Sequence, residues 1–190
     1  LNSMNNLGGL LREKGDHAAA EPLCREVLEV ARETLGNRHP NTLLSIHNLG
    51  QLLAAKGDLA AAEAEPLYRE ALEGQRETLG NRHSHTLTTI NNLGTLLYAK
   101  GDHAAAEPLY REALEARRET LGNRHPSTLT SINCLGRLLQ AKGDFAVAET
   151  LFREALWGRR ETLGNRHPST LVSINNLGKL LKEKAGPERS

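Results

Sequence analysis

The chain has 190 residues, with 24 basic side chains, 23 acidic side chains and only 3% aromatic residues. A net charge of +1 supplies no basic stripe of the kind that binds nucleic-acid phosphates, so nucleic-acid binding is disfavoured. The apolar runs are only a few residues long and far too short to cross a membrane. Leu and Ala must therefore build the core, which suits closely packed helices.

The sequence repeats itself along its whole length. The octet RETLGNRH occurs four times, at 32–39, 76–83, 118–125 and 160–167. The leucines that open successive units are 42, 44, 42 and 42 residues apart, namely Leu1, Leu43, Leu87, Leu129 and Leu171. A period of this size predicts a stacked array, because one such unit cannot bury its apolar face alone.

In chain order, the period predicts a single solenoid over residues 1–184. Its units are 1–42, 43–86, 87–128 and 129–170, followed by a closing helix over 171–184 and a frayed tail over 185–190. The chain opens at Leu1 in the middle of a unit, so we interpret it as part of a longer protein.

The third unit shows how each unit divides into two helices. Its first helix carries Leu87, Ile90, Leu93, Gly94 and Leu97, a spacing that lines one helical face. Lys100-Gly101-Asp102 is the predicted turn, in which Gly ends the first helix and Asp caps the second. The second helix ends before Gly122, and Ser127 or Thr128 is the expected cap of the next first helix.

The second unit contains two more residues than the others, in GDLAAAEAEPLY compared with GDHAAAEPLY. Two residues rotate a helix by about 200° and cannot be absorbed within a packed face. If Tyr68 and Ala71 keep their places, Ala64 takes the position of Ala106. We then expect a longer turn or an extra half-turn of helix around 57–61.

These residues carry a resemblance to a known family. Ile90, Leu93-Gly94, Leu97, Ala106, Tyr110 and Ala113 fall at the spacing of the tetratricopeptide signature. The 42-residue period, with its AEPLYREALE and LGNRHP phrases, resembles the repeats of kinesin light chain. The resemblance implies an all-α, right-handed superhelical solenoid of antiparallel helix pairs, with about four and a half repeats. It also implies a concave groove, lined by the first helices, that binds peptides.

An asparagine recurs on the first helices, one position before the core leucine, often beside a second one. Asn is a mediocre helix former, so its return needs a reason. An amide offers a donor and an acceptor to an extended peptide. Alternatively, these side chains tie down the neighbouring loop or helix, and both functions can coexist. The predicted groove residues of this asparagine row are Asn6, Asn48, Asn91, Asn92, Asn133, Asn175 and Asn176.

Positions further along the same face differ between units, as expected for a recognition surface and also for a tolerant solvated one. We favour recognition and add these positions to the predicted groove: Gln51, Tyr98, Arg137, Gln140 and Lys179. The positive charges near its C-terminal end favour an acidic segment in the ligand.

No pattern in the sequence indicates catalysis, a cofactor or a metal site. The histidines His39, His83, His125 and His167 lie one unit apart and are expected to bond to the loop backbone rather than share an ion. Cys24 and Cys134 lie in distant units, too far apart to bridge. Reduced thiols and the lack of a secretory signal favour a cytoplasmic location.

The sequence therefore predicts a non-catalytic module that binds a peptide or protein segment, as a scaffold or adaptor within a larger protein. The alternative is a structural spacer, or a solenoid that associates with itself end to end without a groove ligand. Trp157, where other units have Glu, either covers the junction to the last helix or is an exposed contact.

Overall fold

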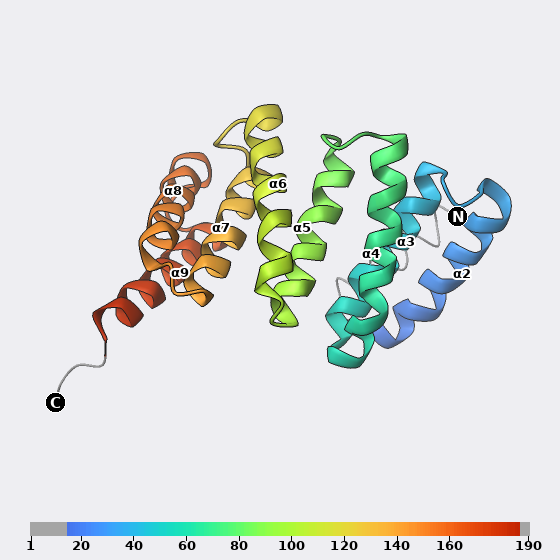
Figure 1. The fold of residues 1–190 in the computed structure, drawn as a ribbon, viewed down its shortest axis with the longest axis horizontal. Coiled ribbons are helices and arrows are strands. Elements are labelled where there is room, and N and C mark those ends of the chain that lie inside the picture. Colours follow the sequence, from blue (N-terminus) through green and yellow to red (C-terminus); the bar gives the residue numbers. More distant parts are fainter. Residues whose placement is uncertain (1–14, 187–190) are drawn as a thin grey trace. The chain divides into compact units, whose positions relative to one another are not determined.

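The chain is helical in a computed structural model that describes residues 15–186, apart from the side chains of 58–61. Within that range there are eight helices and no strands (Figure 1). The helices are α2 (His17–Leu35), α3 (Pro40–Lys56), α4 (Asp58–Thr78), α5 (Ser84–Ala99), α6 (His103–Leu121), α7 (Pro126–Ala141), α8 (Phe145–Leu163) and α9 (Pro168–Ala185). The predicted all-α class is confirmed.

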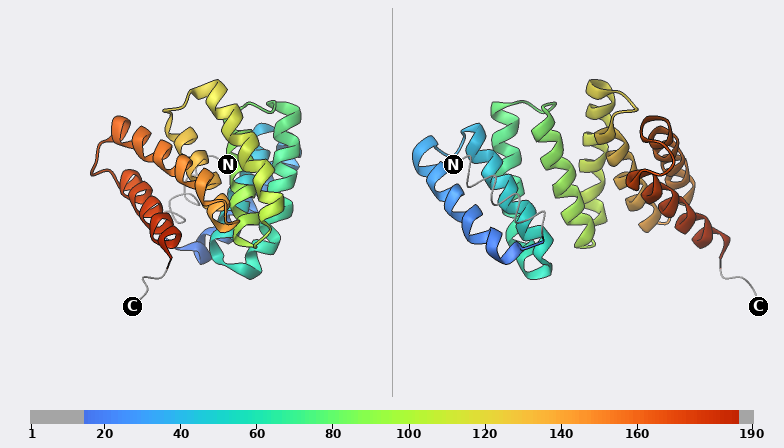
Figure 2. Two further views of the ribbon diagram at one scale, coloured as in Figure 1. Left: turned by 60° about the vertical axis from the view of Figure 1, so that its left-hand side comes forward. Right: turned by 180° about the vertical axis from the view of Figure 1, so that it is seen from behind.

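Neighbouring helices pack against each other within each of two parts of the chain. By its contacts the chain forms two compact parts, here called the N-terminal half (residues 1–96) and the C-terminal half (residues 97–190), with the boundary inside α5. In the N-terminal half α3 packs against α2 and α4. In the C-terminal half α7 packs against α6 and α8, and α8 packs against α9. The orange α8 and the red α9 run in opposite directions, which Figure 2 shows clearly.

The helix starts follow two local rules. Asp102 caps α6 as predicted, since its carboxylate accepts a hydrogen bond from the Ala105 N–H at 3.0 Å. The first helices α3, α7 and α9 instead begin at proline, so the expectation of a Ser127 or Thr128 cap was wrong. His125 is the cap of α7, and its Nδ1 accepts a hydrogen bond from the Ser127 N–H at 3.1 Å. Proline at the first helical position has no N–H to satisfy, so the imidazole bonds the next amide.

An aromatic ring on α4 and another on α8 each pack against a glycine of the preceding first helix, α3 or α7. A Cβ added to Gly136 would lie 2.8 Å from Cε1 of the buried Phe152, and one added to Gly50 would lie 3.2 Å from Cε1 of Tyr68. The absence of a side chain at these glycines brings the two helices together at the short end of the usual spacing. The contact lies in the core of both the α3–α4 pair and the α7–α8 pair.

The two-residue insertion lengthens one helix. α4 has 21 residues, whereas α6 and α8 have 19. Ala64, Tyr68 and Ala71 are buried like their equivalents in the other units, so the register of the packed face is kept. The turn before α4 shrinks to Gly57, which has φ 110°. The extra residues therefore form the predicted half-turn of helix.

The C-terminal end differs slightly from the expectation. Ala185 still belongs to α9, where a frayed tail was predicted from residue 185, and Gly186 caps the helix with φ 74°. Residues 187–190 and 1–14, including the first third of the predicted first unit, lie outside the described residues.

Candidate functional site

Polar side chains join one first helix to the next at the asparagine row. In the N-terminal half, Nδ1 of the buried His47 on α3 lies 2.8 Å from Oγ1 of Thr89 on α5. The other ring nitrogen of His47, Nε2, lies 3.4 Å from Nδ2 of Asn92. In the C-terminal half, Nδ2 of Asn176 on α9 donates a hydrogen bond to Oδ1 of Asn133 on α7 at 2.9 Å. Part of the asparagine row therefore ties neighbouring helices together.

The two asparagine columns differ in burial. Asn91 and Asn133 are buried, whereas Asn48, Asn92 and Asn176 are half-buried. Asn175 is exposed, because it lies on the last helix. Asn6 lies outside the described residues. The half-buried column keeps part of its surface accessible. The side-chain oxygen of Asn176, Oδ1, makes no hydrogen bond with any of residues 15–186.

A hollow of about 220 Å³ lies in the C-terminal half, between the end of α5, α7 and α9. Its lining residues are Tyr98, Arg137, Gln140, Ala141, Asn176, Lys179 and Glu183. Five of the twelve residues predicted for the groove thus meet in one place: Tyr98, Arg137, Gln140, Asn176 and Lys179.

The walls of the hollow are held by specific contacts. The Arg137 guanidinium lies 5.2 Å from the centre of the Tyr98 ring, and that ring stacks on His103 at 5.2 Å. Gln140 donates a hydrogen bond from Nε2 to the Glu183 carboxylate at 2.6 Å. An aromatic face, a cation and two amides are therefore positioned together, a combination that suits peptide recognition.

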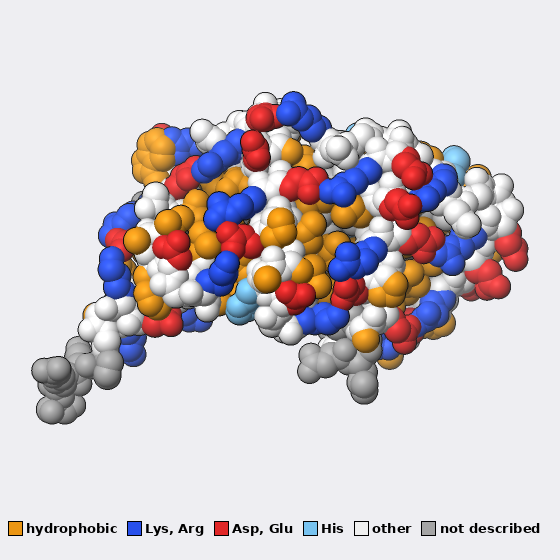
Figure 3. Space-filling view, viewed as in Figure 1, with side chains coloured by type: hydrophobic (Ala, Val, Ile, Leu, Met, Phe, Trp, Pro, Cys, Tyr) orange, Lys and Arg blue, Asp and Glu red, His pale blue; other side chains and the backbone are white. Residues whose placement is uncertain are grey.

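The hollow contains two cations that have no carboxylate partner. Arg137 and Lys179 are exposed, and neither forms an ion pair with any described side chain. Elsewhere, on the surface that Figure 3 shows, basic and acidic side chains are interspersed, so most charged side chains have one of opposite sign nearby. The hollow therefore has a local excess of positive charge.

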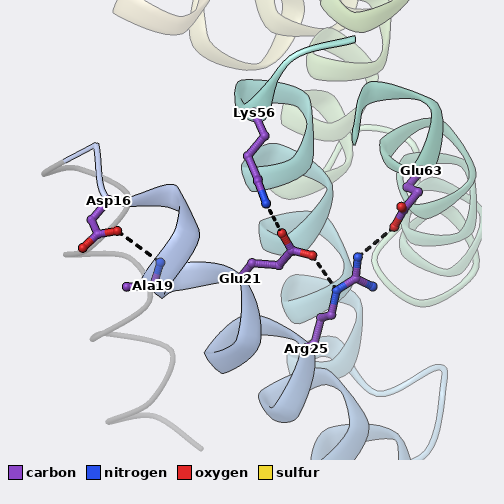
Figure 4. A network of polar contacts seen from close by, with 6 residues as sticks. All are labelled: Asp16, Ala19, Glu21, Arg25, Lys56 and Glu63. Atoms are coloured by element: carbon purple, nitrogen blue, oxygen red, sulfur yellow. Dashed lines mark hydrogen bonds and ion pairs between the residues drawn. The ribbon is translucent and has the colours of Figure 1, made fainter. Parts of the chain in front are cut away.

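A repeated ion-pair cluster shows how charges are paired elsewhere. Glu21 of α2 accepts hydrogen bonds from Lys56 of α3 and from Arg25, which also reaches Glu63 at 2.7 Å (Figure 4). The bonds from Lys56 and then Arg25 lower the pKa of Glu21. The same cluster recurs at Glu107, with Lys142 and Arg111, and at Glu149, with Lys184 and Arg153.

Two arginines of the second helices, Arg117 and Arg159, are buried. Arg117 donates to the Ser131 hydroxyl at 2.7 Å and to the Ser127 carbonyl at 3.1 Å. Arg159 makes the equivalent bonds to Ser173 and Ser169, both at 2.9 Å. Burial lowers the pKa of each guanidinium. These arginines fasten α6 to the start of α7 and α8 to the start of α9.

Several predicted groove residues lie away from the hollow. Three of them belong to the N-terminal half, namely Asn48, Gln51 and Asn92. The hollow is also not lined by the buried Asn91 and Asn133. Glu183 and Ala141 were missed. Glu183 lies seven residues after Asn176 and four after Lys179, so helical spacing alone would have placed it on the same side.

Trp157 is 56% exposed and does not cover the junction to α9. The Arg124 guanidinium lies over its ring, 3.2 Å from the centre. In the first unit the equivalent arginine, Arg38, pairs with Glu73 at 3.5 Å. A cation–π contact therefore replaces an ion pair at this position.

A second hollow, of about 260 Å³, lies beside α2 and α3. None of the predicted groove residues lines it, and two of its arginines are paired, Arg25 with Glu63 and Arg32 with Glu70. Over residues 15–186, no helix combines the length and the apolar character needed to cross a membrane.

Comparison with known proteins matches this geometry. The sequence pattern of the tetratricopeptide repeat family matches four overlapping stretches, residues 1–63, 61–119, 92–156 and 127–189. No curated protein matches the chain.

Solved structures show a similar fold. A kinesin light chain-type protein of Podospora anserina, with nearly identical TPR-like repeats, is 28% identical with a TM-score of 0.83. A single-residue variant of it gives 27% and 0.84. Each comparison covers 99% of this chain and 88% of the other. BtubC (BKLC) of P. vanneervenii is 25% identical with a TM-score of 0.81, over 97% of this chain and 72% of the other. The family pattern and the repeated helix pairs together show that the chain belongs to the tetratricopeptide repeat family.

Proposed function

We propose that this chain is a non-catalytic module that binds a peptide or protein segment along its first helices, with the hollow at Tyr98, Arg137 and Lys179 as its main contact. Tetratricopeptide repeats are in general protein–protein interaction modules, and proteins of this fold are typically scaffolds without enzymatic activity. The observation that carries the proposal is the convergence of five variable or amide positions on one hollow, beside an otherwise repeated framework.

The charge of the hollow favours an acidic ligand. Two exposed cations without ion pairs, Arg137 and Lys179, lie beside a single carboxylate, Glu183, which already accepts a bond from Gln140. A ligand carboxylate would gain two attractive partners at modest desolvation cost, since both cations are exposed. The Asn176 carbonyl oxygen and the Tyr98 ring would hold the ligand backbone and an apolar side chain.

The test is a binding measurement with defined peptide pools. Fluorescently labelled peptides with two central Asp or Glu residues and random flanks are titrated with the chain, beside an Asn/Gln pool of the same design. We expect saturable binding of the acidic pool only. Arg137→Gln/Lys179→Gln should weaken binding at least about fivefold, close to 1 kcal/mol.

The matched control removes equal charge elsewhere. Arg160→Gln/Arg166→Gln gives the same net charge but lies outside the hollow, and it should leave peptide affinity unchanged. Equal losses in both variants would indicate general electrostatic attraction and contradict the proposed site. Asn48→Ala and Asn92→Ala test the asparagine row: if an identified peptide loses no affinity, the row does not contact it.

A further inference from the structure

The last helix, α9, exposes framework residues that are buried in the other first helices. Leu171, Ile174 and Leu181 are 53%, 39% and 40% exposed. Their equivalents on α3 and α7 are at most 3% exposed: Leu43, Ile46 and Leu53 on α3, and Leu129, Ile132 and Leu139 on α7. The second helix of the same unit, α4 or α8, packs against α3 or α7 respectively, whereas no described helix follows α9.

The glycine of α9 is the second sign of an open packing site. Gly50 and Gly136 each receive the aromatic ring of a second helix, Tyr68 or Phe152. Gly178 holds the same position on α9, and nothing lies within 4 Å of the place of its Cβ. Glycine in the middle of a helix weakens it relative to alanine, and here no packing contact within residues 15–186 offsets that loss.

Two arginines supply a third, independent sign. The second helices α2 and α6 each carry an arginine that pairs with the next second helix within the same half of the chain: Arg32 with Glu70 and Arg118 with Glu154, both at 2.7 Å. Their equivalent on α8, Arg160, makes no ion pair with the described residues.

The loop arginines repeat this pattern. Arg38 pairs with Glu77 and Arg124 with Glu161, both at 3.2 Å. The equivalent Arg166 pairs with no described side chain. Both arginines that would reach the helix following α9 are thus unpaired in the described part of the chain.

The apolar side of α9 is distinct from the peptide hollow. Asn176, Lys179 and Glu183 project to one side of the helix. At about 100° per residue, Leu171, Ile174, Gly178 and Leu181 project to nearly the opposite side. A ligand on one surface therefore leaves the other accessible.

We propose that the open face of α9, formed by Leu171, Ile174, Gly178 and Leu181, binds an amphipathic helix with the pattern of this chain's own second helices. That pattern is a small residue, an aromatic residue four positions later and alanine three positions after that, as in Ala148, Phe152 and Ala155. The aromatic ring packs on Gly178, and a glutamate two residues after it pairs with Arg160, as Glu154 pairs with Arg118. The site extends the interface that α7 makes with α8 and is independent of the peptide-binding function proposed above.

The probe is a synthetic peptide with the sequence of residues 144–164 of this chain, titrated into the 190-residue chain by calorimetry. We expect one peptide to bind per chain. Gly178→Leu should weaken binding at least about tenfold, because the added side chain occupies the place of the ring. Its fold should be retained, since no atom lies near the substituted position, and circular dichroism and the urea midpoint check this.

A charge exchange tests the orientation of the bound helix. A peptide with Lys in place of Glu154 should bind several-fold more weakly to the natural chain, and Arg160→Glu in the chain should restore its affinity. The control Arg137→Gln/Lys179→Gln should bind the peptide like the natural chain, which separates this face from the hollow.

Three outcomes would overturn the proposal. They are the absence of saturable binding, equal binding by the folded Gly178→Leu chain, and failure of the charge exchange to restore affinity. Sedimentation of the chain alone provides a further check. A dimer that Gly178→Leu dissociates would assign the open face to a second copy of the chain instead of a helical partner.

Discussion

At the residue scale, equivalent glycines have opposite energetic roles because their neighbours differ. A Cβ on Gly136 would lie 2.8 Å from Phe152, whose ring is fully buried and cannot move aside. A Cβ on Gly178 would meet no atom within 4 Å. The same residue type in the same repeat position therefore satisfies a packing requirement in α7 and only weakens the helix in α9.

We expect Gly136→Ala to destabilise the chain by about 1–3 kcal/mol, because the added methyl group overpacks a filled core. Gly178→Ala should stabilise it by about 0.5–1 kcal/mol through helix propensity. Urea denaturation of the two variants beside the natural chain measures both changes. Destabilisation by both would show that the surroundings of Gly178 are already filled.

At the element scale, a carboxylate on each of the second helices α2, α6 and α8 joins that helix to two cations. Glu107 accepts hydrogen bonds from Lys142 of α7 and from Arg111 one turn along α6, and these bonds, that from Lys142 most of all, lower the pKa of Glu107. Since its side chain is 19% exposed, water screens the cluster only partly. The cluster fastens the end of one first helix to the second helix before it.

Glu107→Gln should destabilise the chain at neutral pH by about 0.2–1 kcal/mol per ion pair. A carboxylate whose pKa is lowered on folding contributes stability above its unfolded value, near 4.3, and loses it as the pH falls through the folded value. The difference between variant and natural chain should therefore shrink from pH 7 to about pH 2.5 in urea titrations.

The control for this substitution lies on the same helix. Glu115 is exposed and forms no ion pair with the described side chains, so Glu115→Gln should change stability little at either pH. A loss for Glu115→Gln as large as that for Glu107→Gln would attribute the effect to net charge rather than to the cluster.

At the scale of the whole molecule, stability in an array is approximately a sum of unit and interface terms. The apolar face of α9 has no described cover, so its interface term is absent. Adding a second helix to the chain should supply that term by burying Leu171, Ile174 and Leu181.

We expect a chain with residues 143–164 appended after Lys184 to unfold at higher urea concentration and with a steeper transition than the natural chain. The join keeps the 42-residue period, so the appended phenylalanine would meet Gly178. An appended segment of equal length with Asp in place of that phenylalanine is the control. Equal urea midpoints for the two extended chains would contradict a packed interface on α9.

The repeat period and the apolar spacing in the sequence were sufficient to predict the helix pairs, the Asp caps and the half-turn insertion in α4. These features depend on local rules: a 3.6-residue period, and an aspartate or glycine at a turn. The choice of Ser127 or Thr128 as a cap failed, because the competing acceptor, the His125 imidazole, depends on the loop conformation.

Contacts between helices decided the rest. The sequence alone could not show that His47 meets Thr89 or that Arg117 and Arg159 are buried. These contacts join side chains of different helices, 42 residues apart for His47 and Thr89 and 10 or 14 residues apart for the arginines, and they depend on how the helices pack. Similarly, the convergence of Tyr98, Arg137 and Lys179 and the exposure of Leu171 follow from which helices have neighbours. The sequence by itself determined the repeating unit, since periodicity is a local property. Only the tertiary structure decided which copies of each residue are buried, paired or exposed, because identical residues acquire different neighbours at different places in the array.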